Sequence, residues 1–394
     1  MDHREPHTEP VIAHVVLTLD IGGAEVLVTR MVDSLREVGF HPCVVCLDAE
    51  GSLAAAVRRG GTSVTCVERR PGILDLACVR RLRRFFLDTG VTLVHTHDLE
   101  AFSYGSLAAW LAGRIPAVHT QHGLPTPFGW RQWLKALAVR HACRRFVGVS
   151  DEVTGIGLES GWFVRDRTET ITNGVDVVAF RPDPSTRQQT RRALDIPEHD
   201  LVVISVARLA EIKDHLTLVR GFAASPLVGT GHLLLVGDGP QRARIEEEID
   251  RVGIAGRTRL LGDRSDVRDL LAGSDVFALT SQSEGISISL LEAMAVGLVP
   301  VVTAVGGNKQ VVHAEDPTPN GMLIAPGAID DLAATFQKLA DDPDLRMRLG
   351  DEARATVRER FSHRAMMDGY ISLYAKNRSP QPDVLTGVGH EEVH

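Results

Sequence analysis

Residues 281–308 read SQSEGISISLLEAMAVGLVPVVTAVGGN. They follow an apolar run, 275–280, with the composition of a strand buried on both faces, as in a parallel sheet. Gly285 then allows a tight turn, and the apolar run 286–296 predicts a short helix that ends at Gly297. Another apolar run after the helix predicts the next strand. This pattern places the loop at the carboxyl edge of a parallel sheet, where open α/β folds bind their ligands.

Two carboxylates stand in this stretch, Glu284 in the loop and Glu292 within the helix. Glu292 is flanked by leucine, alanine and methionine, and a charge in so apolar a helix needs a partner. Carboxylates accept hydrogen bonds from vicinal hydroxyls such as those of sugars and riboses. The alternative is two solvated helix glutamates favoured by the helix dipole, and the apolar flanks weigh against it. Backbone N–H groups of Gly285, Ile286 and Ser287 at the helix start are expected to face an anion.

Length and composition indicate a globular protein of two domains. The chain has 394 residues, of which 44% are hydrophobic and 24% charged. That length exceeds a typical single core, and the composition is ordinary for soluble proteins. The formal net charge of −8 makes free nucleic acid an unexpected partner. No apolar run approaches the ~18 residues of a membrane span.

The cysteines and the first apolar run favour a cytoplasmic protein. Cys43 and Cys46 form a C-x-x-C within a predicted strand, so their side chains are expected on opposite faces. Buried free thiols in a reducing cytosol are therefore expected rather than a redox pair. Residues 11–19 lack the basic flank and cleavage site of a signal peptide, so none is expected.

The first half of the chain alternates between strand and helix patterns, as in a parallel sheet. The predicted strands are residues 11–19, 43–47, 63–67, 92–95, 117–118, 146–149 and 168–172. Gly22 and Gly23 follow the first strand and precede a helix, which is a place where N–H groups can meet a phosphate. The motif is not a complete G-x-G-x-x-G, and an ordinary tight turn is the alternative.

Histidines close two neighbouring predicted strands. His95 and His97 end one strand, with Asp98 following, and His119 and His122 end the next. Two such strand ends at one sheet edge raise the hypothesis of a zinc site. Their spacing is not a recognised zinc pattern and no cysteine accompanies them, so we expect no metal.

Residues 127–145 carry five basic side chains and no acidic one, with Trp130 and Trp133 between them. A basic amphipathic helix with tryptophan can lie on an anionic bilayer. The alternative is a helix that packs on the core and exposes a basic side to water.

The second half begins after a turn at residues 173–176 and repeats the strand and helix pattern. Arg208 and Lys213 follow its first strand, 201–205, where a helix also starts, and two cations there suit a diphosphate. Gly237 and Gly239 follow the next strand in G-D-G-P, and Arg264 lies in the loop after the strand 259–261. Residues 332–339, 345–358 and 365–375 predict three closing helices.

The spacing of Glu284, seven residues, Glu292 and then the glycine pair Gly306 and Gly307 resembles the signature of the retaining glycosyltransferases of family four. The resemblance covers about residues 11–376. It implies an α/β GT-B fold, in which two Rossmann-like βαβ domains face each other across a cleft and the C-terminal helix returns to the first domain. We expect an acceptor-side domain over 11–178, a nucleotide-sugar domain over 179–360 and a closing helix over 361–378, between disordered ends at 1–10 and 379–394.

The resemblance also implies residue roles. His122 would contact the donor sugar near the reacting carbon, and Glu284 would hold that sugar. Arg208 and Lys213 would bind the donor phosphates, and Glu292 the ribose. Further donor contacts are implied at Gly22, Gly23, Gly237, Gly239, Gly285, Ile286 and Ser287, with Arg264 near the nucleobase. His97, Asp98 and Glu100 are candidates for the acceptor side.

Two positions depart from the family pattern and leave the donor and the acceptor open. Gln310 stands where many relatives have glutamate after the glycine pair, and Ala304 stands where many have aspartate before it.

The implied activity is transfer of a sugar from a UDP- or GDP-linked donor, with retention at the anomeric carbon. The acceptor would be a hydroxyl of a glycan, of a lipid-linked molecule or of a small molecule. We expect no cofactor and no divalent metal, because the D-x-D at residues 342–344 lies far from the motifs. Two alternatives stay open: a nucleotide-sugar epimerase on the same fold, and a non-catalytic nucleotide-sugar-binding protein.

Overall fold

The structure is a computed structural model, and it describes residues 9–70, 75–123 and 130–377. The predicted disordered tail, 379–394, and most of the predicted N-terminal one lie outside the described residues. So do the first residues of two predicted helical stretches, 73–87 and 127–145.

The first half forms strands and helices in strict alternation. Its strands are β1 (Val11–Val16), β2 (His41–Cys46), β3 (Ser63–Cys66), β4 (Leu93–His97), β5 (Ala117–Gln121), β6 (Arg145–Gly148) and β7 (Thr168–Thr170). Its helices are α1 (Gly23–Glu37), α2 (Ala54–Arg59), α3 (Leu76–Asp88), α4 (Leu99–Leu111), α5 (Trp130–Val139) and α6 (Asp151–Glu159).

The second half repeats the plan. Its strands are β8 (Val202–Val206), β9 (His232–Val236), β10 (Thr258–Gly262), β11 (Val276–Leu279), β12 (Val299–Thr303) and β13 (Met322–Ile324). Its helices are α7 (Pro184–Ala193), α8 (His215–Ala224), α9 (Arg242–Arg251), α10 (Val267–Ala272), α11 (Ile288–Val296), α12 (Asn308–Val311), α13 (Ile329–Asp341), α14 (Pro343–Arg360) and α15 (His363–Asn377).

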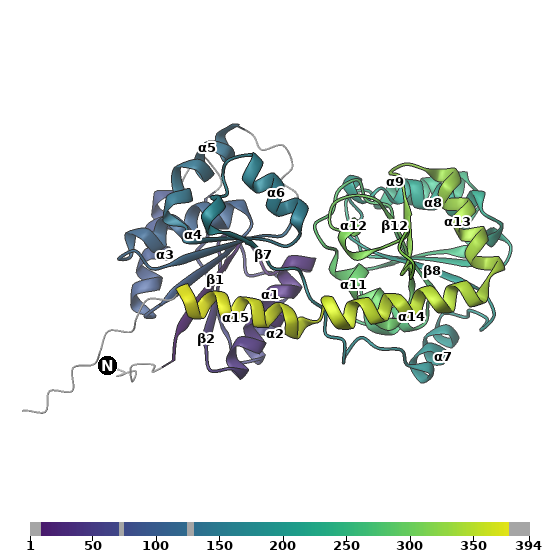
Figure 1. Cartoon of the computed structure of the whole chain (residues 1–394), viewed down its shortest axis with the longest axis horizontal. Coiled ribbons are helices and arrows are strands. Elements are labelled where there is room, and N and C mark those ends of the chain that lie inside the picture. The colour runs from purple at the N-terminus through teal and green to yellow at the C-terminus, as the bar shows by residue number, and fades with distance from the viewer. Residues whose placement is uncertain (1–8, 71–74, 124–129, 378–394) are drawn as a thin grey trace, which may run out of the picture.

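Each half folds around its own parallel sheet, and the two halves lie side by side (Figure 1). The strand orders are β3-β2-β1-β4-β5-β6-β7 and β10-β9-β8-β11-β12-β13. In each sheet the order reverses beside the first strand, since β1 pairs with both β2 and β4, and β8 with both β9 and β11. Connections leave in opposite directions at such a reversal and open a crevice at the carboxyl ends of the strands.

Helices cover both faces of each sheet, so central strands such as β1, β8, β11 and β12 are buried and apolar, as their sequences predicted, whereas the edge strand β7 is polar and only partly buried. Cys43 and Cys46 belong to hydrophobic clusters on different faces of the first sheet. Both are free thiols, as expected from their spacing.

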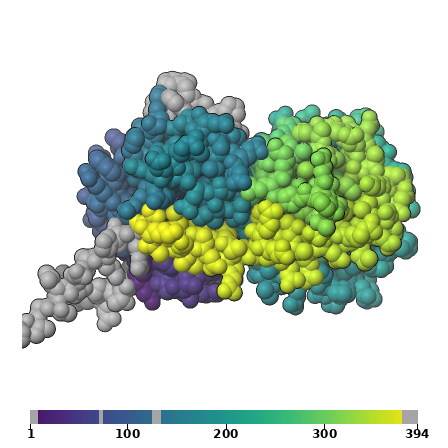
Figure 2. Space-filling model, viewed as in Figure 1, coloured from purple at the N-terminus to yellow at the C-terminus, as the bar shows by residue number. Residues whose placement is uncertain are grey.

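The last two helices tie the halves together. Helix α14 packs on the second domain, and α15, yellow in Figures 1 and 2, crosses back to the first. Two buried tyrosines of α15 reach into the first domain, where the Tyr374 hydroxyl lies 2.6 Å from His95 Nδ1 and the Tyr370 hydroxyl 3.1 Å from Thr120 Oγ1. The expected fold class, two Rossmann-like domains with a returning C-terminal helix, is confirmed.

Most predicted elements differ from the structure by a few residues at their ends, and two of these differences have a clear local cause. The first strand ends at Val16 rather than at residue 19, because the chain then turns and the Leu19 N–H bonds to the Glu50 carbonyl. The helix predicted from residue 286 begins at Ile288, because Ser287 has extended backbone angles and caps it, with its hydroxyl accepting from the Leu290 N–H.

No helix among residues 9–70, 75–123 and 130–377 combines the length and the apolarity needed to cross a membrane.

Candidate active site

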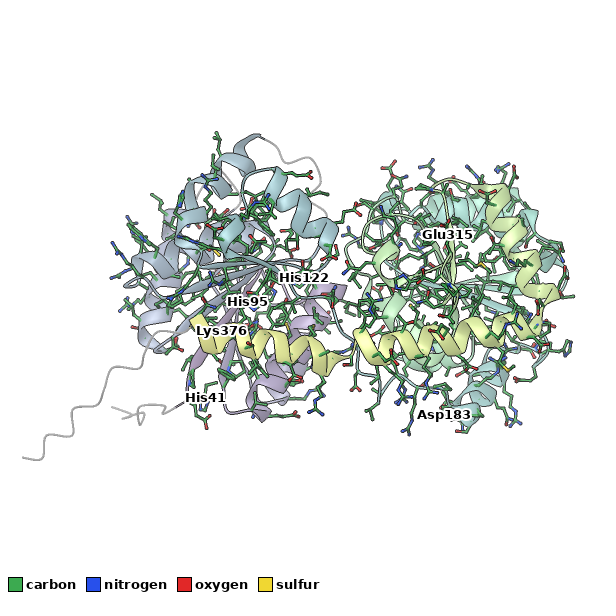
Figure 3. The ribbon with its side chains drawn as sticks, viewed as in Figure 1. His41, His95, His122, Asp183, Glu315 and Lys376 are labelled. Atoms are coloured by element: carbon green, nitrogen blue, oxygen red, sulfur yellow. The ribbon has the colours of Figure 1, made fainter. Side chains whose placement is uncertain are left out.

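The loop that carries Glu284 lies against the first domain. A Cβ added at Gly285 would stand 2.4 Å from the His122 carbonyl oxygen, so only glycine permits this approach. Figure 3 places His122 on the side of the first domain that faces the second. On the other side of the loop, a Cβ on Gly307 would lie 2.2 Å from the Gly285 carbonyl oxygen. The two glycine motifs of the opening stretch therefore pack on each other and bring Glu284 close to His122.

Glu284 forms a buried ion pair with Lys213. The Lys213 ammonium donates to Glu284 Oε1 at 2.6 Å, and the Ser281 hydroxyl donates to the same oxygen at 2.5 Å. Glu284 is only 7% exposed. The structure thus joins two predicted site residues, one expected to hold the donor sugar and one its phosphates. Without a ligand, the carboxylate neutralises the lysine that is expected to meet the diphosphate.

Glu292 is buried in α11, and its partner comes from the other domain. Arg30 Nη2, on α1, donates to Glu292 Oε1 at 2.8 Å. Burial raises the pKa of Glu292, and the charge and hydrogen bond of Arg30 partly oppose that rise. The sequence predicted that this carboxylate needs a partner, but it did not identify Arg30. A basic residue on the helix after Gly22 and Gly23 was the available signal, and no local spacing rule connects residues so far apart in the chain.

Arg208 follows β8, as predicted, and its charge acts on Glu25 of the first domain. Burial raises the pKa of Glu25, the charges of Asp98 and Asp20 raise it further, and the charge of Arg208 lowers it. The sequence did not single out Glu25. The charge of a cation from the second domain therefore acts on a carboxylate of the first domain.

Gly237 and Gly239 pack closely against the backbone on either side of Arg208. Both have positive φ angles, +124° and +157°, and an added Cβ would lie 2.2 Å from the Ala207 carbonyl oxygen and 2.6 Å from that of Leu209. Their structural role is thus the close backbone packing that fixes residues 207–209.

The other predicted donor contacts lie in different surroundings. Gly22 precedes α1 in an extended conformation, and a Cβ there would lie 2.3 Å from a Glu25 carboxylate oxygen. Gly23 faces Ile288 of the second domain. Arg264 is exposed and bonds to Asp266 at 2.6 Å, so its guanidinium is engaged within its own loop.

The acceptor-side candidates are largely engaged by neighbours. Glu100 contacts Arg69 at 3.2 Å and Lys135 at 3.7 Å. Asp98 is half-buried and has a φ of +67°, unusual for a residue other than glycine. His97 is buried, with 1% exposure, and lies behind His122, so it offers no surface to an acceptor in this conformation.

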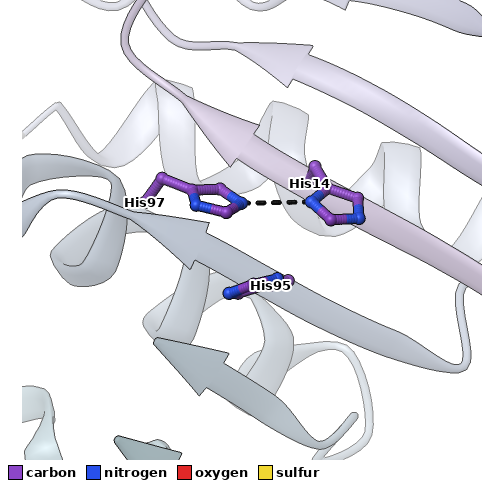
Figure 4. Close-up of side chains that lie close together, drawn as sticks. All are labelled: His14, His95 and His97. Carbon is purple, nitrogen blue, oxygen red and sulfur yellow. Dashed lines mark hydrogen bonds between the residues drawn. The ribbon is translucent and has the colours of Figure 1, made fainter. Parts of the chain in front are cut away.

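Histidines of β1 and β4 and the one after β5 lie close together, and His14, His97 and His122 are linked by hydrogen bonds; Figure 4 shows the link between His14 and His97. His97 Nδ1 lies 2.9 Å from His122 Nε2, and His97 Nε2 lies 3.0 Å from His14 Nδ1. His95 contacts Tyr374 and Thr120 through its two ring nitrogens. Burial lowers the pKa of each of these histidines, so they are neutral at physiological pH.

The same network holds a cluster with metal-ligand geometry. His14, His95 and His97 each have a ring nitrogen within 4.8 Å of the others. Both nitrogens of His95 and of His97, however, already have hydrogen-bond partners in the protein. The arrangement among the described residues is therefore that of a hydrogen-bonded network.

Gln310, one of the two residues that depart from the family pattern, and its neighbour Lys309 contact the first domain. Gln310 Oε1 accepts the Asp151 N–H at the start of α6, 3.0 Å away. Lys309 lies 3.7 Å from Glu152 on the same helix. These side chains therefore contribute to the contact between the two halves.

Comparison with known proteins identifies the family. The family model described as Glycosyltransferase Family 4 matches residues 21–178, and the one described as Glycosyl transferases group 1 matches residues 186–356. Together they account for both domains. The chain therefore belongs to the group 1 glycosyl transferases, glycosyltransferase family 4.

The curated relatives include bacterial glycosyltransferases and a glucosaminyl malate synthase. The chain is 27% identical to the lipopolysaccharide core biosynthesis glycosyltransferase LpsD of Rhizobium meliloti, over 90% of this chain and 95% of that one. It is 25% identical to the UDP-Gal:alpha-D-GlcNAc-diphosphoundecaprenol alpha-1,3-galactosyltransferase of Escherichia coli, over 87% and 91%. With the N-acetyl-alpha-D-glucosaminyl L-malate synthase of Bacillus anthracis it is 31% identical, but spans only 53% of that protein's length.

Solved structures confirm the architecture. The chain superposes on Anabaena HepE in complex with UDP and glucose with a TM-score of 0.85 at 22% identity, over 93% of this chain and 100% of that one. With WaaG, a glycosyltransferase involved in lipopolysaccharide biosynthesis, the TM-score is 0.74 at 17% identity, over 92% and 99%.

Proposed function

We propose that this protein is a retaining glycosyltransferase that moves a sugar from a UDP- or GDP-linked donor to a hydroxyl acceptor without a metal ion. The observation that carries the proposal is the ion pair between Lys213 and Glu284, 2.6 Å long, held where the loop of Gly285 meets His122. A diphosphate needs cations and a sugar needs hydrogen-bond acceptors, and the pair supplies both at one point between the domains.

Donor binding would rearrange two ion pairs. The phosphates would take Lys213 together with Arg208, which releases Glu284 to accept hydrogen bonds from the sugar hydroxyls. The ribose hydroxyls would bond to Glu292, whose carboxylate Arg30 holds in the free protein. Each carboxylate thus has a cationic partner that the donor would replace, and the proposed rearrangement involves side chains.

A front-face displacement is the mechanism that we propose for retention. A double displacement would need a carboxylate nucleophile close below the anomeric carbon. Glu284 is instead held by Lys213 and Ser281. In the front-face route, the bond from the anomeric carbon to the phosphate oxygen breaks while the acceptor oxygen bonds to the same face, and the departing phosphate takes the acceptor proton. Arg208, Lys213 and the N–H groups of residues 285–287 would stabilise the charge that develops on the phosphate.

The acceptor class is proposed from the relatives and from the basic segment 127–145. Relatives act in lipopolysaccharide core synthesis and on a diphosphoundecaprenol-linked sugar, so a lipid-linked saccharide is the first acceptor to test. In α5, Leu134 is 47% exposed, as an apolar side chain that meets lipid would be. We propose peripheral contact with the anionic inner face of a membrane, measured by sedimentation with anionic and with neutral vesicles. Equal binding to both, or to neither, would contradict electrostatic contact.

The first experiment measures thermal stabilisation by UDP, GDP, ADP and dTDP in the presence of EDTA. A ligand that binds only the folded state raises the apparent stability, so the nucleotide of the donor should give the largest shift. UDP is the first to try, given the ligand of the Anabaena neighbour. No shift with any nucleotide would contradict the site as proposed.

Incubation with the matching nucleotide-sugars separates the three candidate functions. Release of the nucleotide that depends on an added acceptor supports a transferase. Conversion of the donor sugar without any acceptor would indicate an epimerase, and tight binding without turnover under either condition would indicate a binding protein.

A further inference from the structure

Three imidazoles form a chain from the domain boundary into the core of the first domain. His122 Nε2 lies 2.9 Å from His97 Nδ1, and His97 Nε2 lies 3.0 Å from His14 Nδ1. The rings are nearly parallel, with interplanar angles of 23° and 11°. Figure 4 shows the inner link, in which His14 on β1 and His97 on β4 point at each other.

Neutral imidazoles can arrange their protons in only two ways along such a chain. Each neutral ring has one N–H donor and one bare nitrogen acceptor, so the direction of one hydrogen bond fixes the next. Either all N–H groups point toward His122, or all point toward His14. Burial keeps the three rings neutral, because it lowers the pKa of each.

The two ends of the chain differ in what can reach them. His14 Nε2 and His122 Nδ1 are both buried and have no hydrogen-bond partner in the part of the chain that the structure describes. An N–H on His14 Nε2 would stay unpaired in the core, at a cost of about 1–3 kcal/mol for a lost buried hydrogen bond. His122 as a residue is partly exposed at the domain boundary, whereas His14 is 0% exposed, so an N–H on His122 Nδ1 can reach water or a ligand after a small movement of the ring.

We infer that His14 and His97 are positioning residues that hold His122 as the tautomer protonated on Nδ1, so that His122 donates a hydrogen bond to a hydroxyl oxygen of the donor sugar. In this arrangement His14 Nδ1–H donates to His97 Nε2, and His97 Nδ1–H donates to His122 Nε2. His97, which the sequence placed with the acceptor, then acts behind His122. The sugar as ligand rests on the proposed function, whereas the tautomer does not.

The first test reads the tautomer without any substrate. In protein labelled with ¹⁵N in histidine, the two ring nitrogens of a neutral imidazole have clearly different shifts, and the spectrum of His122→Gln identifies the His122 signals. We expect the proton of His122 on Nδ1. A proton on Nε2 would overturn the inference whatever the enzyme's activity.

The second test changes the far end of the chain. His14→Asn keeps an amide N–H near the place of Nδ1, whereas His14→Leu removes the donor. We expect H14L to lose the Nδ1–H state of His122 and to lower kcat about 10- to 100-fold, the range found for residues that orient a reactive group from behind, while H14N recovers part of both. A folded H14L protein with the original tautomer and unchanged kcat would overturn the inference.

A neighbouring buried histidine provides the control. His119 bonds to Thr96 rather than to the chain, so His119→Asn should leave the tautomer of His122 unchanged. If H14L does not fold, the spectrum of the unsubstituted protein still decides the inference.

Titration with the nucleotide alone and with the nucleotide-sugar tests the ligand. The His122 shift should move only when the sugar is present. A shift with the nucleotide alone would assign the acceptor oxygen to a phosphate instead and would overturn the sugar contact. If no nucleotide binds at all, the proposed function fails while the tautomer result stands.

Discussion

Arg30 and Glu292 join the two domains through one charged hydrogen bond, 2.8 Å long, between α1 and α11. Arg30 also lies over the ring of Phe180, at 5.4 Å from its centroid, where the chain passes between the domains. The carboxylate that we expect to bind the donor ribose therefore also holds the free protein together. Donor binding and domain contact are thus linked at one residue.

The free energy of unfolding that Arg30→Met removes should depend on pH. A carboxyl group whose pKa is raised on folding binds a proton more readily in the folded state than in the unfolded state. The free energy of unfolding therefore falls as the pH rises from the unfolded pKa of that group, about 4.3, through its folded pKa. Burial already raises the pKa of Glu292, and loss of Arg30 should raise it further. We expect R30M to lose about 1–3 kcal/mol at pH 8 and clearly less at pH 5, measured by urea denaturation.

Arg36→Met is the matched control, because Arg36 is exposed on the same helix. It should show little loss at either pH. An equal loss for R30M at both pH values would argue that Arg30 acts through packing rather than through the charge of Glu292.

Replacement of Glu292 by glutamine should weaken nucleotide binding. The amide keeps the shape of the side chain but loses the charged acceptors for the ribose hydroxyls, which corresponds to about tenfold in Kd. Isothermal titration with the nucleotide that gives the largest thermal shift would measure the change. Glu247→Gln, exposed on α9, should leave the Kd unchanged. If E292Q binds as tightly as the original protein, Glu292 does not bind the ribose.

The cations at the site should affect turnover more than binding. If Lys213 and Arg208 stabilise charge that develops on the departing phosphate, Lys213→Met and Arg208→Met should lower kcat by about 100-fold or more. The KM for the donor should change much less. The control is Lys338→Met, on the exposed face of α13, which should keep full activity. A rise in KM with unchanged kcat would show that the cations serve ground-state binding alone.

Local sequence patterns predicted the fold and many residues of the candidate site, because each of those patterns depends only on residues that are neighbours in sequence. Strand composition and the glycine at the end of α11 are local features, and the structure has both. The pairs Arg30–Glu292 and His14–His97 join strands and helices far apart in the chain, so spacing could not reveal them. Histidines at two strand ends raised the hypothesis of a metal site, and only the pairing of β1 with β4 brings His14 to within hydrogen-bond distance of His97. The roles assigned to individual site residues stay predictions.

Arg191 should be essential to the stability of the second domain. Its side chain is 2% exposed, bonds to Asp275 at 2.7 Å and donates to four backbone carbonyls, those of Gly273, Pro197, Glu198 and Asp200. Lysine keeps the charge but cannot reach this set of acceptors from one planar group. We expect Arg191→Lys to lower the free energy of unfolding by about 3–5 kcal/mol, as for a broken buried ion pair. The exposed neighbour Arg192→Lys should change it little, and similar losses for both would contradict a special role of Arg191.

Gly285→Ala should keep the nucleotide site but hinder the contact between the domains. A Cβ at this position would lie 2.4 Å from the His122 carbonyl oxygen and 3.2 Å from a Val149 methyl group, so the loop must withdraw from the first domain. Arg208, Lys213 and Glu292, which are expected to bind the phosphates and the ribose, lie in the second domain outside this loop. The N–H groups of residues 285–287 move with the loop, and their expected role is with the charge that develops on the phosphate during the reaction. We expect nearly unchanged nucleotide affinity and a larger radius of gyration in small-angle X-ray scattering. We also expect kcat to fall about 100-fold, because a small misplacement of reacting groups has a large effect on the rate. Gly256→Ala is the control, since a Cβ there meets nothing within 4 Å. If G285A turns over normally with an unchanged radius, the approach of this loop to His122 is not needed for catalysis, and the reacting groups must be assembled by other contacts between the two sheets.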